Sequence, residues 1–84
     1  MKIFALTTHQ VFDGCDDLGI VVRVFSTEEK AVEALQKFIS SEMEYVKRDG
    51  WVIEMEDSTS FIAYEQGYYA TNHSIGIVEQ KNLE

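Results

Sequence analysis

The chain of 84 residues contains no proline and only one cysteine, Cys15. A single thiol cannot form an intrachain disulfide, so a small secreted scaffold stapled by disulfides is excluded. Basic side chains are also scarce, with 7 lysines and arginines against 15 aspartates and glutamates and a formal net charge of −8. A field of this sign repels phosphate groups, so we expect no direct binding of nucleic acid and no attraction to an anionic membrane surface.

Long apolar runs and catalytic motifs are missing as well. The apolar run at residues 1–6 ends at Thr7 and is far shorter than a signal sequence or a membrane span, so we expect a cytoplasmic protein. The chain has no G-x-G-x-x-G fingerprint, no P-loop and no nucleophile elbow. We therefore expect a non-enzymatic protein with no catalytic residue, no bound metal and no cofactor.

The length and the apolar content of 45% predict one folded domain. We place this domain at residues 1–82 and interpret Leu83 and Glu84 as a cloning remnant. Two stretches rich in β-branched and aromatic residues, from Lys2 to about Phe12 and from Ile20 to Phe25, read as strands joined by a polar turn.

A helix is predicted over about residues 27–48. Ser26 and Glu29 have the spacing of a capping box, in which Ser26 is the N-cap. Asp49-Gly50 supplies a left-handed stop after Lys47 and Arg48. Apolar residues at helical spacing form the predicted buried stripe: Val32, Leu35, Phe38, Ile39, Met43 and Val46.

Three further strands are expected over residues 51–56, 60–65 and 74–80. Strict alternation in the first of these places two sets of side chains on opposite faces, Trp51, Ile53 and Met55 against Val52, Glu54 and Glu56. The resulting order ββαβββ predicts a two-layer α+β domain, with a single long helix packed on a mainly antiparallel five-stranded sheet. The first strand is apolar in both phases and fits the sheet interior, which leaves the orders 2-1-3-4-5 and 2-1-5-4-3 open.

One helix covers about 10 Å of a sheet that is about 20 Å wide, so part of the sheet should stay uncovered. A mixed apolar and acidic patch there suits a dimer or partner interface, although side chains of the sheet and of the long loop that follows Glu65 could equally cover one another. The candidate patch comprises one phase of the first strand together with Val52, Ile62 or Tyr64, Val78, Glu54 and Glu56.

Several polar groupings are candidate chemical sites. Cys15 lies among three aspartates that disfavour its thiolate, and those aspartates lack the spacing of a calcium-binding loop. Glu54 and Glu56 would lie about 7 Å apart on one strand face, which resembles an acid–base pair but is more typical of a solvated face. His9 and His73 would meet if the first and last strands are neighbours, and with a carboxylate they could hold a metal.

The segment from Tyr64 to His73 holds three of the four tyrosines and one of the two histidines. It can be a packed hairpin end, in which Gly67 allows the turn, or a contact surface, since tyrosine is enriched at binding hot spots. The predicted interaction residues are Tyr64, Tyr68, Tyr69, Asn72, His73, Glu54 and Glu56.

The signature that runs from Trp51 through Phe61, Tyr64-Glu65 and Gly67-Tyr68-Tyr69-Ala70 to Asn72-His73 resembles one found in small, uncharacterised bacterial and prophage-borne proteins. The resemblance implies a shared fold and a mobile-element context, and it carries over no activity.

The sequence therefore predicts a small acidic protein-interaction module. Its partner is either a second copy, giving a homodimer, or a basic nucleic-acid-binding protein that a phage-borne chain would inhibit. The alternative is a small-ligand or metal-binding protein that uses His9, His73 and the cluster at Tyr64–Tyr69.

Overall fold

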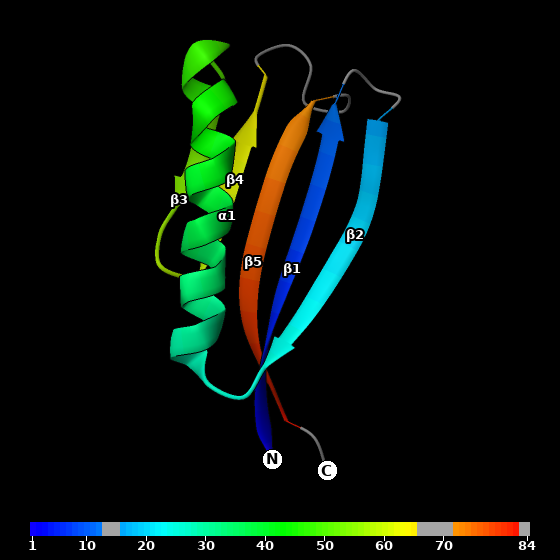
Figure 1. Ribbon diagram of the computed structural model, residues 1–84, viewed down its shortest axis with the longest axis vertical. Helices are drawn as coiled ribbons and strands as arrows, with labels where there is room; N and C mark the ends of the chain where they lie inside the picture. Colours follow the sequence, from blue (N-terminus) through cyan, green and yellow to red (C-terminus); the bar gives the residue numbers. More distant parts are fainter. Residues whose placement is uncertain (13–15, 66–71, 83–84) are drawn as a thin grey trace.

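The computed structural model describes residues 1–12, 16–65 and 72–82 and shows one helix lying against a sheet (Figure 1). The elements, in chain order, are β1 (Lys2–Phe12), β2 (Asp16–Phe25), α1 (Glu28–Arg48), β3 (Val52–Glu56), β4 (Ser60–Tyr64) and β5 (His73–Asn82). The five strands form one sheet in the order β2-β1-β5-β4-β3, and every neighbouring pair is antiparallel. The predicted α+β fold is confirmed, and the second of the two expected strand orders is the one formed.

β1 lies inside the sheet, as its apolar character in both phases predicts. It is paired with β2 on one side and with β5 on the other, so that Leu6 lies between Arg23 and Val78. The β1–β5 ladder runs from the pair Lys2–Asn82 to the pair Val11–His73. Two segments at opposite ends of the sequence thus form the longest ladder of the domain.

The core lies between α1 and one face of the sheet. Leu6, Leu35 and Phe61 are almost fully buried there, from β1, α1 and β4 respectively. Gly76 in β5 lets the helix come close, because a Cβ at this position would lie 2.9 Å from Leu35 Cδ1 and 3.2 Å from the Phe38 ring. The apolar stripe of α1 therefore packs directly on the β5 backbone.

The N-cap of α1 differs from the predicted one. Thr27, not Ser26, has the extended backbone of a cap, and its Oγ1 accepts a hydrogen bond of 3.3 Å from the Lys30 backbone N–H. Both residues can cap a helix, and the path of the chain leaving β2 selects the second. The predicted C-terminal end of the helix is confirmed, since Lys47 and Arg48 lie in the last turn and Gly50 has a φ of 67°.

β3 departs from the strict alternation predicted for it. The register shifts between Ile53 and Met55, so that Ile53 pairs with Ala63, Met55 with Ile62 and Glu56 with Phe61. Glu54 lies in this bulge, where one extra residue interrupts the alternation of faces. Ile53 and Met55 consequently lie on opposite faces, and the prediction that Glu54 and Glu56 share a face is wrong.

Candidate functional site

We use the name open face for the side of the sheet opposite α1. Gln10 in β1 contacts Glu42 of the helix, so the even-numbered residues of β1 face α1. Because side chains alternate along a strand, the odd-numbered residues of β1 face away from the helix. The strand pairings extend this assignment across the sheet. The residues of the open face are Ile20, Val22 and Val24 in β2; Ile3, Ala5, Thr7, His9 and Val11 in β1; His73, Ile75, Ile77 and Glu79 in β5; Ser60, Ile62 and Tyr64 in β4; and Val52 and Met55 in β3.

Most of the predicted uncovered patch lies on this face. Val52, Ile62 and Tyr64 are partly exposed there, and Met55 is 45% exposed. Val78 is the exception, because it pairs with Leu6 and belongs to the core beneath α1. The expectation that Val78 contributes to the uncovered surface is therefore wrong.

The two histidines meet on the open face, as expected if β1 and β5 are neighbours. His9 Nδ1 lies 3.2 Å from His73 Nε2, and the rings are arranged edge to face with their centroids 4.9 Å apart. One of these nitrogens must donate and the other accept, so two fully protonated imidazolium rings cannot form the bond. The pair links the two strands on a face that has no helix.

A metal site does not follow from this pair alone. Within residues 1–12, 16–65 and 72–82, no group of three or more histidine, cysteine, aspartate or glutamate side chains is arranged to hold a metal ion. The histidine nitrogens that face each other are already bonded to one another. A site with three protein ligands of these types would require residues beyond those the structure describes.

The predicted tyrosine segment is partly defined. Asn72 is buried, and its Nδ2 donates to Glu65 Oε2 at 2.9 Å while the Glu65 backbone N–H donates to the Asn72 carbonyl at 3.1 Å. Tyr68 and Tyr69 lie outside the described residues. Because Asn72 and His73 are both only 9% exposed, they hold this end of the open face and present little surface of their own.

A buried polar cluster beneath α1 escaped the sequence reasoning. The Glu42 carboxylate is 3% exposed and accepts hydrogen bonds from Gln10 Nε2 in β1 and, at 2.8 Å, from Ser74 Oγ in β5. Burial and the neighbouring Glu42 raise the pKa of Tyr45 above its ordinary value. Glu42 follows Leu35 by seven residues and precedes Val46 by four, so its place on the buried stripe is the signal that could have revealed it.

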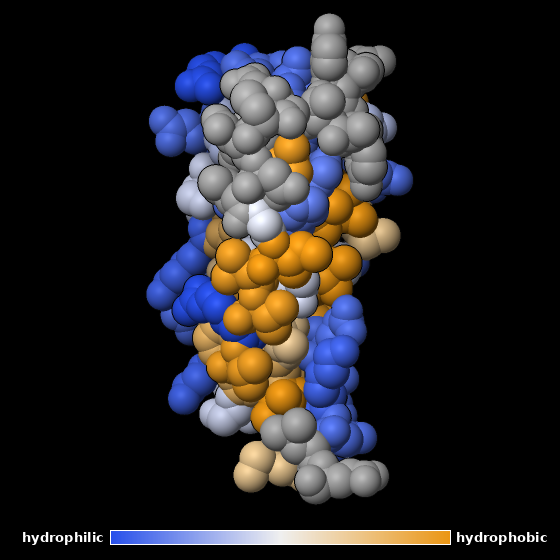
Figure 2. Space-filling view, turned by 90° about the vertical axis from the view of Figure 1, so that its right-hand side faces the viewer, coloured by the Kyte–Doolittle hydropathy of each residue, from blue (hydrophilic) through white to orange (hydrophobic). Residues whose placement is uncertain are grey.

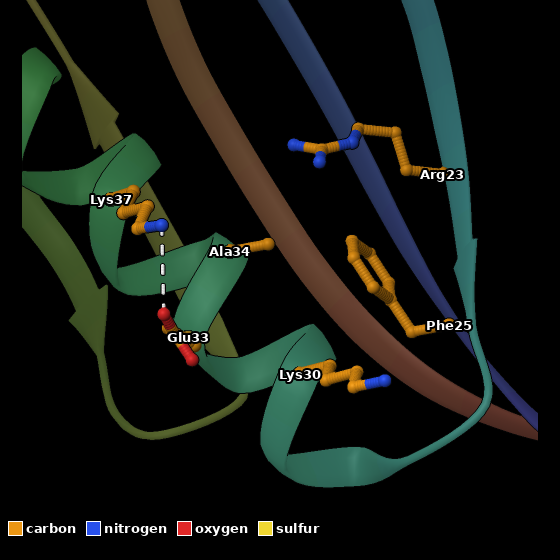
Figure 3. Close-up of a pocket in the computed structure, with 6 residues that line it drawn as sticks. All are labelled: Arg23, Phe25, Lys30, Glu33, Ala34 and Lys37. Atoms are coloured by element: carbon orange, nitrogen blue, oxygen red, sulfur yellow. Dashed lines mark ion pairs between the residues drawn. The ribbon is translucent and has the colours of Figure 1, made fainter.

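A groove runs between β2 and α1 on the helix side of the sheet (Figure 3). It has a volume of about 210 Å³ and is lined by Arg23, Phe25, Lys30, Glu33, Ala34 and Lys37. The Arg23 guanidinium lies 5.1 Å from the centre of the Phe25 ring, and Lys37 forms an exposed ion pair of 3.5 Å with Glu33. Three cations against one carboxylate make this groove basic, in contrast to the chain as a whole.

Comparisons with known proteins add no assignment. Neither a scan against protein-family models nor searches of curated proteins and solved structures found a match to this chain. The resemblance to prophage-borne proteins thus stays a prediction. In the part of the chain that the structure describes, no helix is both long and apolar enough to cross a membrane.

Proposed function

We propose that this protein is a non-enzymatic protein-interaction module and that its contact surface is the half of the open face formed by β3, β4 and β5. The observation that carries the proposal is a contiguous set of apolar side chains on the face without a helix, comprising Val52, Met55, Ile62, Tyr64, Ile75 and Ile77. Apolar surface of this kind, bordered by polar groups, is typical of protein interfaces.

Tyr64 is the proposed anchor of this surface. It stands in β4 between Val52 of β3 and His73 of β5, and backbone pairing on both sides holds its position. His73 is in turn bonded to His9. A partly exposed tyrosine on such a rigid support loses little conformational freedom on binding, which favours its use as a hot spot.

The proposed partner is a basic protein. Glu54, Glu56 and Asp57 are exposed at the β3 edge, next to Met55 on the open face. Carboxylates at the rim of an apolar patch steer a cationic surface toward it and make the association sensitive to salt. If the gene belongs to a mobile element, as the resemblance implies, a nucleic-acid-binding host protein is a suitable target of inhibition.

Affinity purification from a host lysate at low and high salt tests the proposal when it is combined with matched variants. Ile62→Lys places a charge in the apolar patch, whereas Ser40→Lys adds the same charge on the exposed side of α1. We expect a basic partner to be retained by the wild type and by Ser40→Lys but lost with Ile62→Lys. Equal retention by both variants would overturn the assignment of the open face.

The acidic rim is tested separately. Glu54→Gln with Glu56→Gln removes two carboxylates at the β3 edge, and Glu33→Gln with Glu44→Gln removes two from the exposed side of α1. We expect only the first pair to weaken binding at low salt, and the difference to vanish at high salt. An identical loss of binding in both double variants would show that the total charge of the protein, and not the acidic rim at β3, controls the association.

The contact between His9 and His73 supports a second candidate function, the binding of a divalent metal or a small ligand on the open face. A ligand that binds only the folded state raises the unfolding temperature. Thermal unfolding with zinc, nickel, cobalt and a metabolite panel therefore tests this candidate. A shift that disappears in both His9→Ala and His73→Ala would support it, and no shift with any ligand would exclude it for that panel.

A further inference from the structure

The two edges of the sheet differ in a way that bears on self-association. β3 is five residues long, carries a bulge at Glu54 and has two glutamates, which are features that protect an edge from pairing. β2 is ten residues long and begins with Asp16 and Asp17. Its register with β1 shifts near Gly19, which has a φ of 75°, whereas residues 20–25 are regular and apolar apart from Arg23. Its exposed fractions are 69% for Ile20, 48% for Val21, 56% for Val22 and 59% for Val24.

The exposed β2 edge offers hydrogen-bonding groups as well as apolar side chains. Among the described strands β2 pairs only with β1, so between Ile20 and Phe25 the N–H and C=O groups of every second residue point away from the sheet. Figure 2 faces this side of the molecule and shows an apolar strip there. From Ile20 to Phe25 the strand has no proline, lysine or carboxylate, and Arg23 is its only charge. Within these six residues no bulge or carboxylate protects the edge.

We propose that two copies of this chain associate by antiparallel pairing of their β2 edges, forming a dimer with a ten-stranded sheet. A two-fold axis through the paired Val22 residues places Ile20 of each copy opposite Val24 of the second copy. On the other face Val21 lies opposite Arg23 of the second copy. A register centred on Arg23 is disfavoured, because it would place two like charges directly opposite each other.

The distribution of charge favours association of two copies through the β2 edge over association through the β3 edge. Two molecules with a net charge of −8 repel each other, and the repulsion is weaker along residues 20–25, which carry no carboxylate, than along the acidic β3 edge. Asp16 and Asp17 of β2 lie beyond the residues that pair in this register. Pairing through β2 leaves the acidic β3 edges at the two far ends of the extended sheet. A stable interface needs about 500 to 800 Å² from each copy, about 10 to 15% of the 5437 Å² of accessible surface.

The dimer goes beyond the proposed function and does not depend on it. The proposed contact surface lies on β3, β4 and β5, with β1 between it and β2, so it stays free when the β2 edges pair. The two-fold axis is perpendicular to the sheet, and the open faces of both copies therefore lie on the same side. Loss of the dimer and loss of partner binding are consequently separable results.

Analytical ultracentrifugation of the wild type from about 1 µM to about 1 mM measures the association directly. Val22→Lys puts a charge at the centre of the proposed ladder, and Met55→Lys puts one on the open face at the opposite edge, where Met55 is 45% exposed. We expect the wild type to dimerise, Val22→Lys to raise the dissociation constant about tenfold or more, and Met55→Lys to leave it nearly unchanged. Circular dichroism confirms that each variant is folded.

Disulfide cross-linking tests the register. In a Cys15→Ser background, Val22→Cys places the two new thiols opposite each other, within the Cα separation of about 4.4 to 6.8 Å that a disulfide accepts. Val24→Cys is the matched control, being exposed to 59% against 56% for Val22, and its two copies would lie about 13 Å apart. We expect rapid cross-linking only through residue 22.

Three results would overturn the proposal. They are a wild type that stays monomeric over the whole concentration range, a dimer that Met55→Lys weakens as much as Val22→Lys does, and equal cross-linking at both positions. The second of these would indicate stacking of open faces. A monomer that instead captures an extended peptide on β2 would assign this edge to a different occupant.

Discussion

Gly76→Ala is the substitution for which the structure gives the sharpest expectation. The added Cβ would lie 2.9 Å from Leu35 Cδ1 and 3.2 Å from two atoms of the Phe38 ring. Leu35 is fully buried, so its methyl group cannot move toward solvent. Overpacking of this kind costs about 1 to 3 kcal/mol, whereas replacing a strand glycine by alanine recovers about 0.5 to 1 kcal/mol of chain entropy. We expect a net loss of about 1 to 2 kcal/mol.

Urea unfolding at a fixed protein concentration measures this loss, since self-association would otherwise contribute to the apparent stability. A double-mutant cycle with Leu35→Ala isolates its cause. Leu35→Ala alone should cost about 2 to 5 kcal/mol, but it removes the methyl group that meets the new Cβ. Gly76→Ala should then cost less than it does alone, because only the contacts of 3.2 Å with the Phe38 ring remain, giving a coupling of at least about 0.5 kcal/mol. Additive effects, or a Gly76→Ala variant as stable as the wild type, would refute close packing of α1 on β5.

Three further substitutions test other features of the fold. Glu42→Ala should lower the free energy of unfolding by about 2 to 4 kcal/mol in urea unfolding, because it leaves a cavity and removes the acceptor of the buried Ser74 hydroxyl. Thr27→Ala should lower the free energy of unfolding by about 1 kcal/mol in the same assay, and Ser26→Ala should lower it by less than about 0.5 kcal/mol. A larger loss for Ser26→Ala than for Thr27→Ala would instead support Ser26 as the N-cap. The pKa of Tyr45 is raised above its ordinary value of 10.0 by burial and by Glu42, so the unfolded state loses this proton first as the pH rises. Stability should therefore fall above about pH 10, with a smaller slope in Tyr45→Phe, which pH-dependent unfolding measures.

Local patterns predicted the elements well because each is encoded by neighbouring residues. The helix needed only its apolar stripe, a cap-forming residue at its start and Gly50 at its end. The strands needed only β-branched and aromatic runs between turn-forming residues. The choice of Thr27 over Ser26 marks the limit of this reasoning, since the two hydroxyls are locally equivalent and the departure of the chain from β2 decides between them.

Parts of the candidate site depend on contacts that no local pattern encodes. The bulge at Glu54 arises from the register between β3 and β4, and it separates Glu54 from Glu56. The Glu42 cluster joins residues 32 positions apart, and no pattern within the helix alone places a hydroxyl donor from β5 beside this carboxylate. Val78 faces the core because β5 pairs with β1 in a register that sets it beside Leu6, and the pattern within β5 alone does not specify that register.

The sequence by itself determined the acidic character of the chain and, in its described residues, one helix and five strands, because charge, apolar content and periodicity are properties of short segments. Only the tertiary structure decided that β5 lies between β1 and β4, and this one choice places His73 against His9, 64 residues away. β2 lies at an edge in both of the orders that the sequence left open, and the structure shows its valines exposed there. Strand order is settled by the packing of the whole sheet against α1, in which every strand competes for the same helix face, and so no single segment can specify it.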